Sequence, residues 1–438
     1  MEVVTYKPSG VPSDALRRIR SRLFQMDPGL VQRVAEIIEG VRSGGDEALI
    51  HYTKEFDGVA LEPAGIRVDP DHLRELASRA DPKVVSAFRR AIDNVRRFHE
   101  RERETGWLEE VEDGCRVGLR VLPVSVAGLY VPGGRAAYPS SILMNAVPAQ
   151  VAGVPRILVT TPPGTLERVP AVAAVLHELG IEEVYRVGGA HAIAALAFGT
   201  ESVPRVDKIV GPGNAYVAMA KKLVYGTVGI DSVAGPTEVV VLADDSANPR
   251  FIAADLLAQA EHDEQASAIC ITTDEGLAAE VADEVGRQLE TLDRKQIATA
   301  SIQQYGAVFV ADSLEDGCGL VNQLAPEHLE LMTRDNDAVA RLITNAGAIF
   351  FGDWASEPVG DYIAGPNHVL PTLGTSRFSS PLGVYDFIKR QSLIHYSSGA
   401  MARNASAIAA MAGAEGLTAH RRAVMIRQQQ RPGNQKSE

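Results

Sequence analysis

The sequence predicts an α/β protein with two consecutive parallel sheets, a helical N-terminal region and a small helical C-terminal arm. Short apolar runs such as RILVTTPP and EVVVLAD alternate with helical patterns, which is typical of Rossmann-like βαβ units with buried parallel strands. The alternation restarts once, after Gly235-Pro236, so we expect two sheets of similar size. The 438-residue length also exceeds what one hydrophobic core supports, since cores stop growing near about 250–300 residues.

Residues 1–114 predict a mainly helical region that packs on the sheets. Asp27-Pro28 is a helix start, with Asp as the N-cap and Pro in the first turn. Apolar side chains follow at helical spacing until Gly44-Gly45, where we expect that helix to end. A second helical pattern runs from Pro82 to about Glu104. Neither pattern carries residues that indicate chemistry.

Residues 115–235 predict the first α/β domain and residues 236–386 the second. In the first, VGLRVLPVSVAGLYV predicts a pair of strands, and the later strands are separated by expected helices at Ser140–Val151, Leu166–Leu179, Ala190–Phe198 and Ala215–Val224. In the second, we expect strands at EVVVLAD, SAICITTD, GAVFVAD, LELMT and AIFFGDW. Residues 387–438 predict a helical arm without a strand partner, which is either a small cap or a segment that packs on another subunit.

Composition excludes several classes of protein. The 43 basic and 56 acidic residues give a net charge of −13, and no basic run exceeds two residues, so nucleic acid is not an expected partner. No apolar stretch approaches the roughly 18–20 residues of a membrane helix. The first twenty residues lack the apolar region of a signal peptide, which favours a cytoplasmic location. Three well-separated cysteines exclude a disulfide framework and a cysteine zinc cluster.

Polar residues gather near expected strand ends, and ligands of open parallel sheets bind at the carboxyl ends of strands. Gln259 and His262 are three residues apart at the end of an apolar helix, so they lie on one face. They also fit a plain polar last turn, in which the helix dipole favours the histidine. Glu327-His328 precedes LELMT and offers two groups for proton transfer, but it also fits a surface turn.

Two further groups of polar residues also allow both a functional and a purely structural interpretation. Asp361 and His368 lie in a Gly/Pro-rich segment after AIFFGDW, which we expect to be a loop, and such loops usually only turn the chain. Glu415 and His420 are five residues apart, a spacing that spreads them around a continuous helix. Nitrogen and oxygen donors from separate segments can hold a single metal ion. If the segments converge, that donor set is Gln259, His262, Asp361 and His420.

The glycine-rich segments give weaker signals. No G-x-G-x-x-G is present, so the dinucleotide fingerprint is missing. Gly211-Pro-Gly213-Asn214 follows an expected strand and opens a helix, which leaves backbone N–H groups for a phosphate. It also fits a plain turn. The residues alone therefore predict a two-sheet α/β protein with a candidate mononuclear metal site, and they leave the reaction open.

Longer motifs resemble the histidinol dehydrogenases. In chain order these motifs are YVPGGRAAYPSSILMNAVPAQVAGV, VGGAHAIAALAFGT, DKIVGPGNAYVAMAKK, AGPTEVVVLAD, LLAQAEHD, APEHLEL, GDYIAGPNHVLPT, SSPLGVYDFIKR and LTAHRRAV. The resemblance implies oxidation of L-histidinol to L-histidine by two NAD⁺ through an enzyme-bound aldehyde, the last step of histidine biosynthesis, with one Zn²⁺ per subunit. It also implies a homodimer in which the arm crosses to the partner and the active sites are shared.

The resemblance also implies roles for single residues. Zinc ligands are Gln259, His262, Asp361 and His420, and the acid–base pair is Glu327 and His328. Substrate contacts are Thr237, His368 and Glu415, together with His328 and the zinc ligands. Coenzyme contacts are Tyr130, His191 and Asn214.

One position departs from the family pattern. His191 stands where the family usually has a glutamine that contacts NAD, and an imidazole is shorter than that amide and can become charged. Thr237 stands where serine is also common, and it keeps the hydroxyl. Two alternatives remain: a related zinc and NAD dehydrogenase for another small alcohol, such as a sulfonated diol, and a non-catalytic metal- or nucleotide-binding protein. Loss of Glu327 or His328 would mark the second alternative, and both residues are present.

Overall fold

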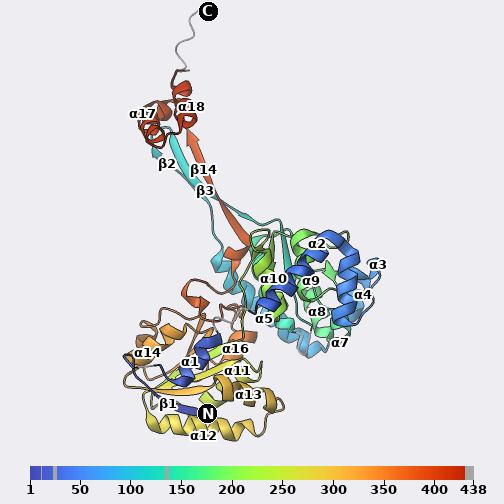
Figure 1. Ribbon diagram of the computed structural model, residues 1–438, viewed down its shortest axis with the longest axis vertical. Coiled ribbons are helices and arrows are strands. Elements are labelled where there is room, and N and C mark those ends of the chain that lie inside the picture. The colour runs from blue at the N-terminus through green and yellow to red at the C-terminus, as the bar shows by residue number, and fades with distance from the viewer. Residues whose placement is uncertain (11, 23–26, 134–137, 430–438) are drawn as a thin grey trace, which may run out of the picture. The chain divides into compact units, whose positions relative to one another are not determined.

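A computed structural model describes residues 1–10, 12–22, 27–133 and 138–429, and the chain forms two compact units (Figure 1). Unit 1 comprises Met1–Glu102 and Val124–Phe387, and unit 2 comprises Arg103–Pro123 and Ile388–Glu438. The predicted α/β class with two parallel sheets is confirmed, and both parallel sheets lie in unit 1. Within the described ranges, no helix has the length and apolarity needed to cross a membrane.

The first sheet of unit 1 has five parallel strands in the order β6-β5-β4-β7-β8. Because the first strand of this sheet, β4, lies in the middle, the chain winds outward from it in both directions. Apolar side chains of α2, α9 and α10 form one core cluster with this sheet. The strands are β4 (Val126–Tyr130), β5 (Arg156–Thr160), β6 (Val184–Tyr185), β7 (Lys208–Val210) and β8 (Gly229–Ile230). The helices are α2 (Pro28–Asp57), α3 (Pro63–Ile66), α4 (Pro70–Ala77), α5 (Pro82–His99), α6 (Pro139–Ala152), α7 (Thr165–Arg168), α8 (Pro170–Glu178), α9 (Gly189–Phe198) and α10 (Ala215–Val224), with the 3₁₀ turn η2 (Glu100–Glu102).

Helix α2 continues past the glycine pair where we expected it to end. Gly45 has a φ of 53° inside the helix, a conformation that glycine adopts without steric cost. The chain then resumes as helix, and the Asp46 N–H donates to Glu201 Oε2 at 2.7 Å. The glycine pair therefore kinks the helix, because a carboxylate from elsewhere in the fold caps the second segment.

The second sheet has six parallel strands in the order β1-β11-β10-β9-β12-β13. Helices α11, α12 and α13 contribute to the core cluster on one face, and α1, α14 and α15 contribute to the cluster on the other. The strands are β1 (Glu2–Tyr6), β9 (Glu238–Ala243), β10 (Ser267–Thr272), β11 (Ala307–Ala311), β12 (His328–Met332) and β13 (Ala348–Phe351). The helices are α1 (Asp14–Ser21), α11 (Pro249–Ala260), α12 (Glu275–Leu289), α13 (Lys295–Tyr305), α14 (Leu314–Leu324), α15 (Asn336–Ala340) and α16 (Glu357–Tyr362), with the 3₁₀ turns η3 (Thr375–Arg377) and η4 (Val384–Phe387).

Unit 2 corrects the prediction that the arm has no strand partner. Strand β14 (Ile388–Tyr396) pairs antiparallel with β3 (Cys115–Pro123), which also pairs with β2 (Trp107–Glu112). The two strands predicted as a pair, β3 and β4, both form but lie in different sheets. All nine residues of β14 are exposed or half-buried, so the strand lacks the apolar run by which the others were recognised. Helices α17 (Ser398–Ala414) and α18 (Thr418–Gln429) follow it.

Candidate active site

The predicted acid–base pair lies where the strands of the second sheet begin. His328 is the first residue of β12 and is in register with Val239 of β9 and Ala348 of β13. Thr237 directly precedes β9. We expected polar groups at the carboxyl ends of strands, and for this sheet that expectation was wrong. Helix α11 returns from the end of β9 to the start of β10, so its last turn, with Gln259, also lies at the amino edge.

A hydrogen-bonded chain joins three of the predicted residues. Gln259 Nε2 donates to Thr237 Oγ1 at 2.7 Å, and that hydroxyl donates to Glu327 Oε2 at 2.5 Å. The Glu238 N–H donates to the same carboxylate oxygen at 3.0 Å. Burial raises the pKa of Glu327 to about 8, although these two donors act in the opposite direction. Gln259 Oε1 is buried without a hydrogen-bond partner among the described residues, which leaves it free to accept from a ligand or bind a cation.

Three histidines of the site hold the same tautomer. In His328, His262 and His368, Nδ1 lies within hydrogen-bond distance of a backbone carbonyl, which can only accept, so Nδ1 carries the proton and Nε2 is an acceptor. The carbonyls are those of Glu238, Ala258 and Asp361, at 3.1, 3.0 and 3.1 Å respectively. Burial lowers the pKa of His328 and of His368, which favours the neutral form. In the described part of the chain, His328 Nε2 is buried without a partner, and a neutral imidazole with a free Nε2 can take a proton.

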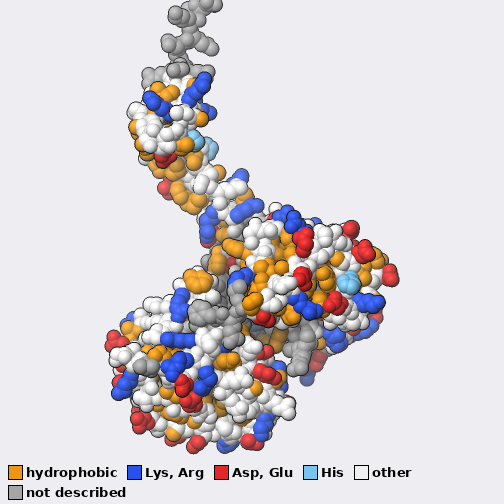
Figure 2. Space-filling view, in the orientation of Figure 1, with side chains coloured by type: hydrophobic (Ala, Val, Ile, Leu, Met, Phe, Trp, Pro, Cys, Tyr) orange, Lys and Arg blue, Asp and Glu red, His pale blue; other side chains and the backbone are white. Residues whose placement is uncertain are grey.

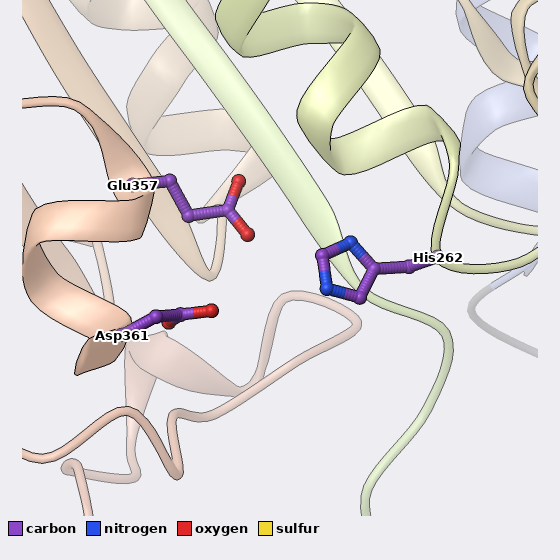
Figure 3. Close-up of side chains that lie close together, drawn as sticks. All are labelled: His262, Glu357 and Asp361. Carbon is purple, nitrogen blue, oxygen red and sulfur yellow. The ribbon is translucent and has the colours of Figure 1, made fainter. Parts of the chain in front are cut away.

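A group of potential metal ligands lies beside these residues. His262, Glu357 and Asp361 each offer one ligand atom, and the three atoms lie within 4.8 Å of one another. Figure 3 shows the His262 ring pointing toward the two carboxylates. Asp361, expected in a loop, lies in α16 with Glu357 four residues before it, so both side chains project from one helix face.

Glu357 was missed in the sequence. Its segment was assigned to a loop, although Ser356 followed by a proline in the first turn is a helix-start signal. The Glu357 side chain is buried, and its backbone N–H donates to Glu330 Oε1 at 2.9 Å. Burial raises the pKa of Glu357 well above its usual range, and four carboxyl neighbours add to the effect. These neighbours are Asp361, Glu327, Glu330 and Asp255.

A small cavity connects this cluster with the first sheet. Its volume is about 200 Å³, and Thr237, His262, Glu327, His328, Glu357, Asp361 and His368 line it together with Ser141, Gly211 and Asp231. His368 Nε2 lies 3.5 Å from Ser141 Oγ. Several polar side chains therefore converge on this cavity, which suits a small molecule with several nitrogen and oxygen atoms.

A larger cavity of about 1160 Å³ lies next to it, and His262 lines both. The predicted coenzyme residues Tyr130, His191 and Asn214 line the larger one. Tyr130 ends β4, and its hydroxyl accepts from the Gly189 N–H at the start of α9 at 3.1 Å. Asn214 is the N-cap of α10. Helix N-termini favour anions, so this wall suits a phosphate-bearing ligand.

His191 is buried in α9 and differs from the expectation that it can become charged. Burial lowers its pKa to about 4, so the ring is neutral near pH 7. Its Nε2 lies 3.3 Å from Thr53 Oγ1, and Nδ1 is buried without a partner within the described ranges. The His191 side chain can therefore contribute a hydrogen bond and van der Waals contact to a ligand, but no charge.

The remaining predicted residues lie in unit 2. Glu415 follows α17, and His420 lies in α18. Gly416, with a φ of 70°, separates the two helices. Both side chains are exposed, and neither belongs to the cluster that unit 1 assembles.

Comparison with known proteins identifies the family. The family model described as histidinol dehydrogenase matches residues 21–428. The chain belongs to the histidinol dehydrogenase family. A curated histidinol dehydrogenase from Halalkalibacterium halodurans is 54% identical over 395 residues, which cover 90% of this chain and 93% of that protein. One from Aquifex aeolicus is 50% identical over 394 residues, which cover 90% and 91%.

A crystal structure of a histidinol dehydrogenase supports the same assignment. The enzyme from Elizabethkingia anophelis superimposes with a TM-score of 0.90 at 36% sequence identity and covers 98% of both chains. The resemblance found in the sequence is therefore confirmed, and this histidinol dehydrogenase family member is an oxidoreductase.

Proposed function

We propose that the protein catalyses the zinc- and NAD-dependent, four-electron oxidation of L-histidinol to L-histidine through an enzyme-bound aldehyde, the last step of histidine biosynthesis. One arrangement carries this proposal: the free Nε2 of His328 and the Glu327 carboxylate line the same small cavity as the candidate metal ligands. A base, a second proton carrier and a cation site around one small cavity suit the oxidation of a small amino alcohol.

The residues of unit 1 fit a zinc ion. His262 presents Nε2 because Nδ1 is held by a carbonyl, and metal-bound histidines are usually oriented in this way. Gln259 Oε1 is buried without a partner in the described structure, and Asp361 supplies a carboxylate. The negative end of the α11 dipole, at its last turn, also favours a cation. We propose Gln259, His262, Asp361 and His420 as zinc ligands.

The residues of the larger cavity fit NAD. The N-termini of α9 and α10 suit its diphosphate, and the cavity volume of about 1160 Å³ is large enough for a dinucleotide. We propose Tyr130, His191 and Asn214 as coenzyme contacts. Since His262 lines both cavities, the reacting end of the coenzyme would lie beside the substrate.

The proposed chemistry gives His328 and Glu327 different proton-transfer roles. When bound, NAD⁺ would accept a hydride in each of two oxidations, and zinc would orient the substrate through its amine and imidazole nitrogens. His328 Nε2 takes the hydroxyl proton of the alcohol in the first oxidation. Glu327 takes a proton from the water that adds to the aldehyde, while the protonated His328 returns its proton to the aldehyde oxygen, so that a hydrate forms and Nε2 is free again. His328 then takes a hydroxyl proton of the hydrate in the second oxidation, and the resulting acid loses its proton to solvent to give the carboxylate.

The lining of the small cavity favours histidinol over a sulfonated alcohol. The carboxyl groups of Glu327, Glu357 and Asp361 all face the cavity. Their oxygens can accept from the N–H groups of an ammonium or imidazole, and a sulfonate offers no such donors. Thr237 and His368 add polar contacts for the substrate. We further propose that Glu415 binds the substrate amine. A non-catalytic role has less support, because Glu327 and His328 are both present and share the cavity.

We propose that the protein acts as a homodimer with shared active sites. Unit 2 carries His420 and Glu415 on its surface, together with exposed apolar side chains visible in part in Figure 2. These include Val111, Ile394, Met411 and Leu417, with exposed fractions of 60, 72, 62 and 41%. Large exposed apolar side chains on a small unit favour a protein interface, and the family resemblance supports an arm that crosses to the partner.

Zinc removal provides the first test of this function. The purified enzyme should reduce NAD⁺ in the presence of L-histidinol, and treatment with a chelator should abolish turnover. The fold should remain, because the ligands lie between preformed sheets, so the circular dichroism spectrum should be unchanged. Added Zn²⁺ should restore the rate, and Mn²⁺ or Co²⁺ should replace it in part, since no thiolate is among the donors. Full activity in a sample shown to be metal-free would contradict the proposal.

The unusual histidine of α9 gives a second prediction. His191→Gln should change the KM for NAD⁺ by about two- to tenfold, which corresponds to one hydrogen bond of about 0.5–1.5 kcal/mol. Zinc content should not change. Because the imidazole is neutral above its pKa of about 4, the wild-type KM should show no step from this group between pH 6 and 8. An unchanged KM in the variant would show that this position does not contact the coenzyme.

A further inference from the structure

Glu357 lies among the candidate metal ligands without a role in the scheme above. Its carboxylate comes within 4.8 Å of the ligand atoms of His262 and Asp361, and Figure 3 shows it pointing at the imidazole. Only 2% of the residue is exposed. Its neighbour on the same helix face, Asp361, is a proposed zinc ligand, so both side chains reach the same point from one turn of α16.

One oxygen of Glu357 has no protein partner. Oε2 is buried and makes no hydrogen bond to any described residue. Burying a carboxylate oxygen is strongly unfavourable unless a donor or a cation compensates it. The backbone N–H of Glu357 does not help, because it donates to Glu330 Oε1 at 2.9 Å. A divalent cation between His262, Asp361 and Glu357 would satisfy this oxygen and reduce the repulsion between the two carboxylates.

We propose that Glu357 is a metal ligand, so that unit 1 alone holds a divalent cation. Gln259 lies one helical turn before His262, and with it unit 1 offers four nitrogen and oxygen donors, the number that zinc usually takes. Zinc would then bind each subunit before His420 arrives from the arm. This inference rests on the proposed zinc site and adds a ligand and an order of assembly to it.

The test measures zinc binding to the full-length chain. Metal-free wild type, Glu357→Gln and His420→Ala are titrated with Zn²⁺ in competition with a chromogenic chelator. We expect Glu357→Gln to raise the Kd for zinc about 10- to 100-fold, an effect at least as large as that of removing an outer partner of a metal site. We expect His420→Ala to retain one zinc per subunit.

Glu330→Gln is the matched control. It changes a neighbouring buried carboxyl that accepts from the backbone N–H of Glu357 and interacts with Asp255 but is not among the candidate metal ligands, so its Kd should stay within about threefold of wild type. A ligand role also predicts that the visible absorption spectrum of the Co²⁺ form changes in Glu357→Gln and not in Glu330→Gln. Should Glu357→Gln fail to fold, Glu357→Asp keeps the charge but shortens the reach, and it should also weaken zinc binding.

The other outcomes would overturn the zinc site, the ligand role of Glu357 or the order of assembly. If wild type binds no zinc, the proposed zinc site is wrong, and the role of Glu357 falls with it. If wild type binds zinc and Glu357→Gln binds it equally well, only this inference is overturned. Equal weakening by Glu330→Gln would show that loss of any buried carboxyl nearby weakens zinc binding, and this would overturn the ligand role. An unchanged cobalt spectrum in Glu357→Gln would also overturn it. Loss of zinc from His420→Ala would overturn the order of assembly.

Discussion

Replacing His328 by asparagine should lower kcat for L-histidinol by about 10²–10⁴-fold, the usual contribution of a general base. The amide side chain of the variant is close in size to the imidazole and could still donate to the Glu238 carbonyl, as His328 Nδ1 does at 3.1 Å. It lacks a nitrogen equivalent to the free Nε2 that we propose takes the proton. Steady-state rates with L-histidinol and with L-histidinal as substrates should fall together, because the same nitrogen serves both oxidations in the proposed scheme.

Glu327→Gln provides the contrast to this variant. The amide can still accept from Thr237 and from the Glu238 N–H, so the hydrogen-bonded chain to Gln259 should survive. It cannot take a proton from water, so oxidation of the alcohol should be spared more than hydration of the aldehyde. A His328→Asn variant that loses activity on only one of the two substrates would contradict a common base. Equal losses on both substrates in Glu327→Gln would contradict the separate roles.

The fold was predictable because buried parallel strands have a strong local signature. Strands such as β9 and β11 are buried on both faces and therefore read as continuous apolar runs. Strand β14 was missed because its side chains are largely exposed, so its position depends on pairing with β3, which lies far away in the sequence. Gly45 was interpreted as a helix end because Glu201, which caps the helical segment after it, is also distant in the sequence.

The site was predictable only in part. Residue types and the family resemblance singled out His262, Glu327, His328 and Asp361, and unit 1 brings all four to one cavity. Glu357 lies in a segment whose sequence pattern does not clearly predict a helix. No local feature indicated that it lies near His262, which comes much earlier in the sequence. Its proximity is a property of the sheet order, in which β12 and β13 follow β9 toward one edge.

The edges of the two sheets explain why the small cavity suits a cation and the large one an anion. Crossover helices begin at the carboxyl edge of a parallel sheet and end at its amino edge. The first sheet contributes the carboxyl edge, with the N-termini of α9 and α10, and the second contributes the amino edge, with the C-terminus of α11. Helix dipoles therefore place positive partial charge beside the proposed coenzyme and negative partial charge beside the proposed zinc.

A mixture of two inactive variants should regain activity if the active site is shared between subunits. His328→Ala removes the base from unit 1, and His420→Ala removes a ligand from unit 2, so each homodimer should be nearly inactive. In a mixed dimer with crossed arms, one site would receive both lesions and the other neither. The regained activity therefore reports on whether His328 and His420 of one site come from different chains.

The expected size of the effect follows from random pairing. Co-refolding equal amounts should give about half mixed dimers, each with one intact site of two, and so about a quarter of wild-type activity. Subunit exchange is checked independently by giving the two variants different affinity tags and isolating the doubly tagged dimer. That purified dimer should have about half the wild-type rate. If each chain completes its own site, every site keeps one lesion, and the doubly tagged dimer stays inactive, which would rule out sharing. Zinc content of the same dimer adds a second readout, because the inferred Glu357 ligand predicts one zinc per subunit even at the site that lacks His420.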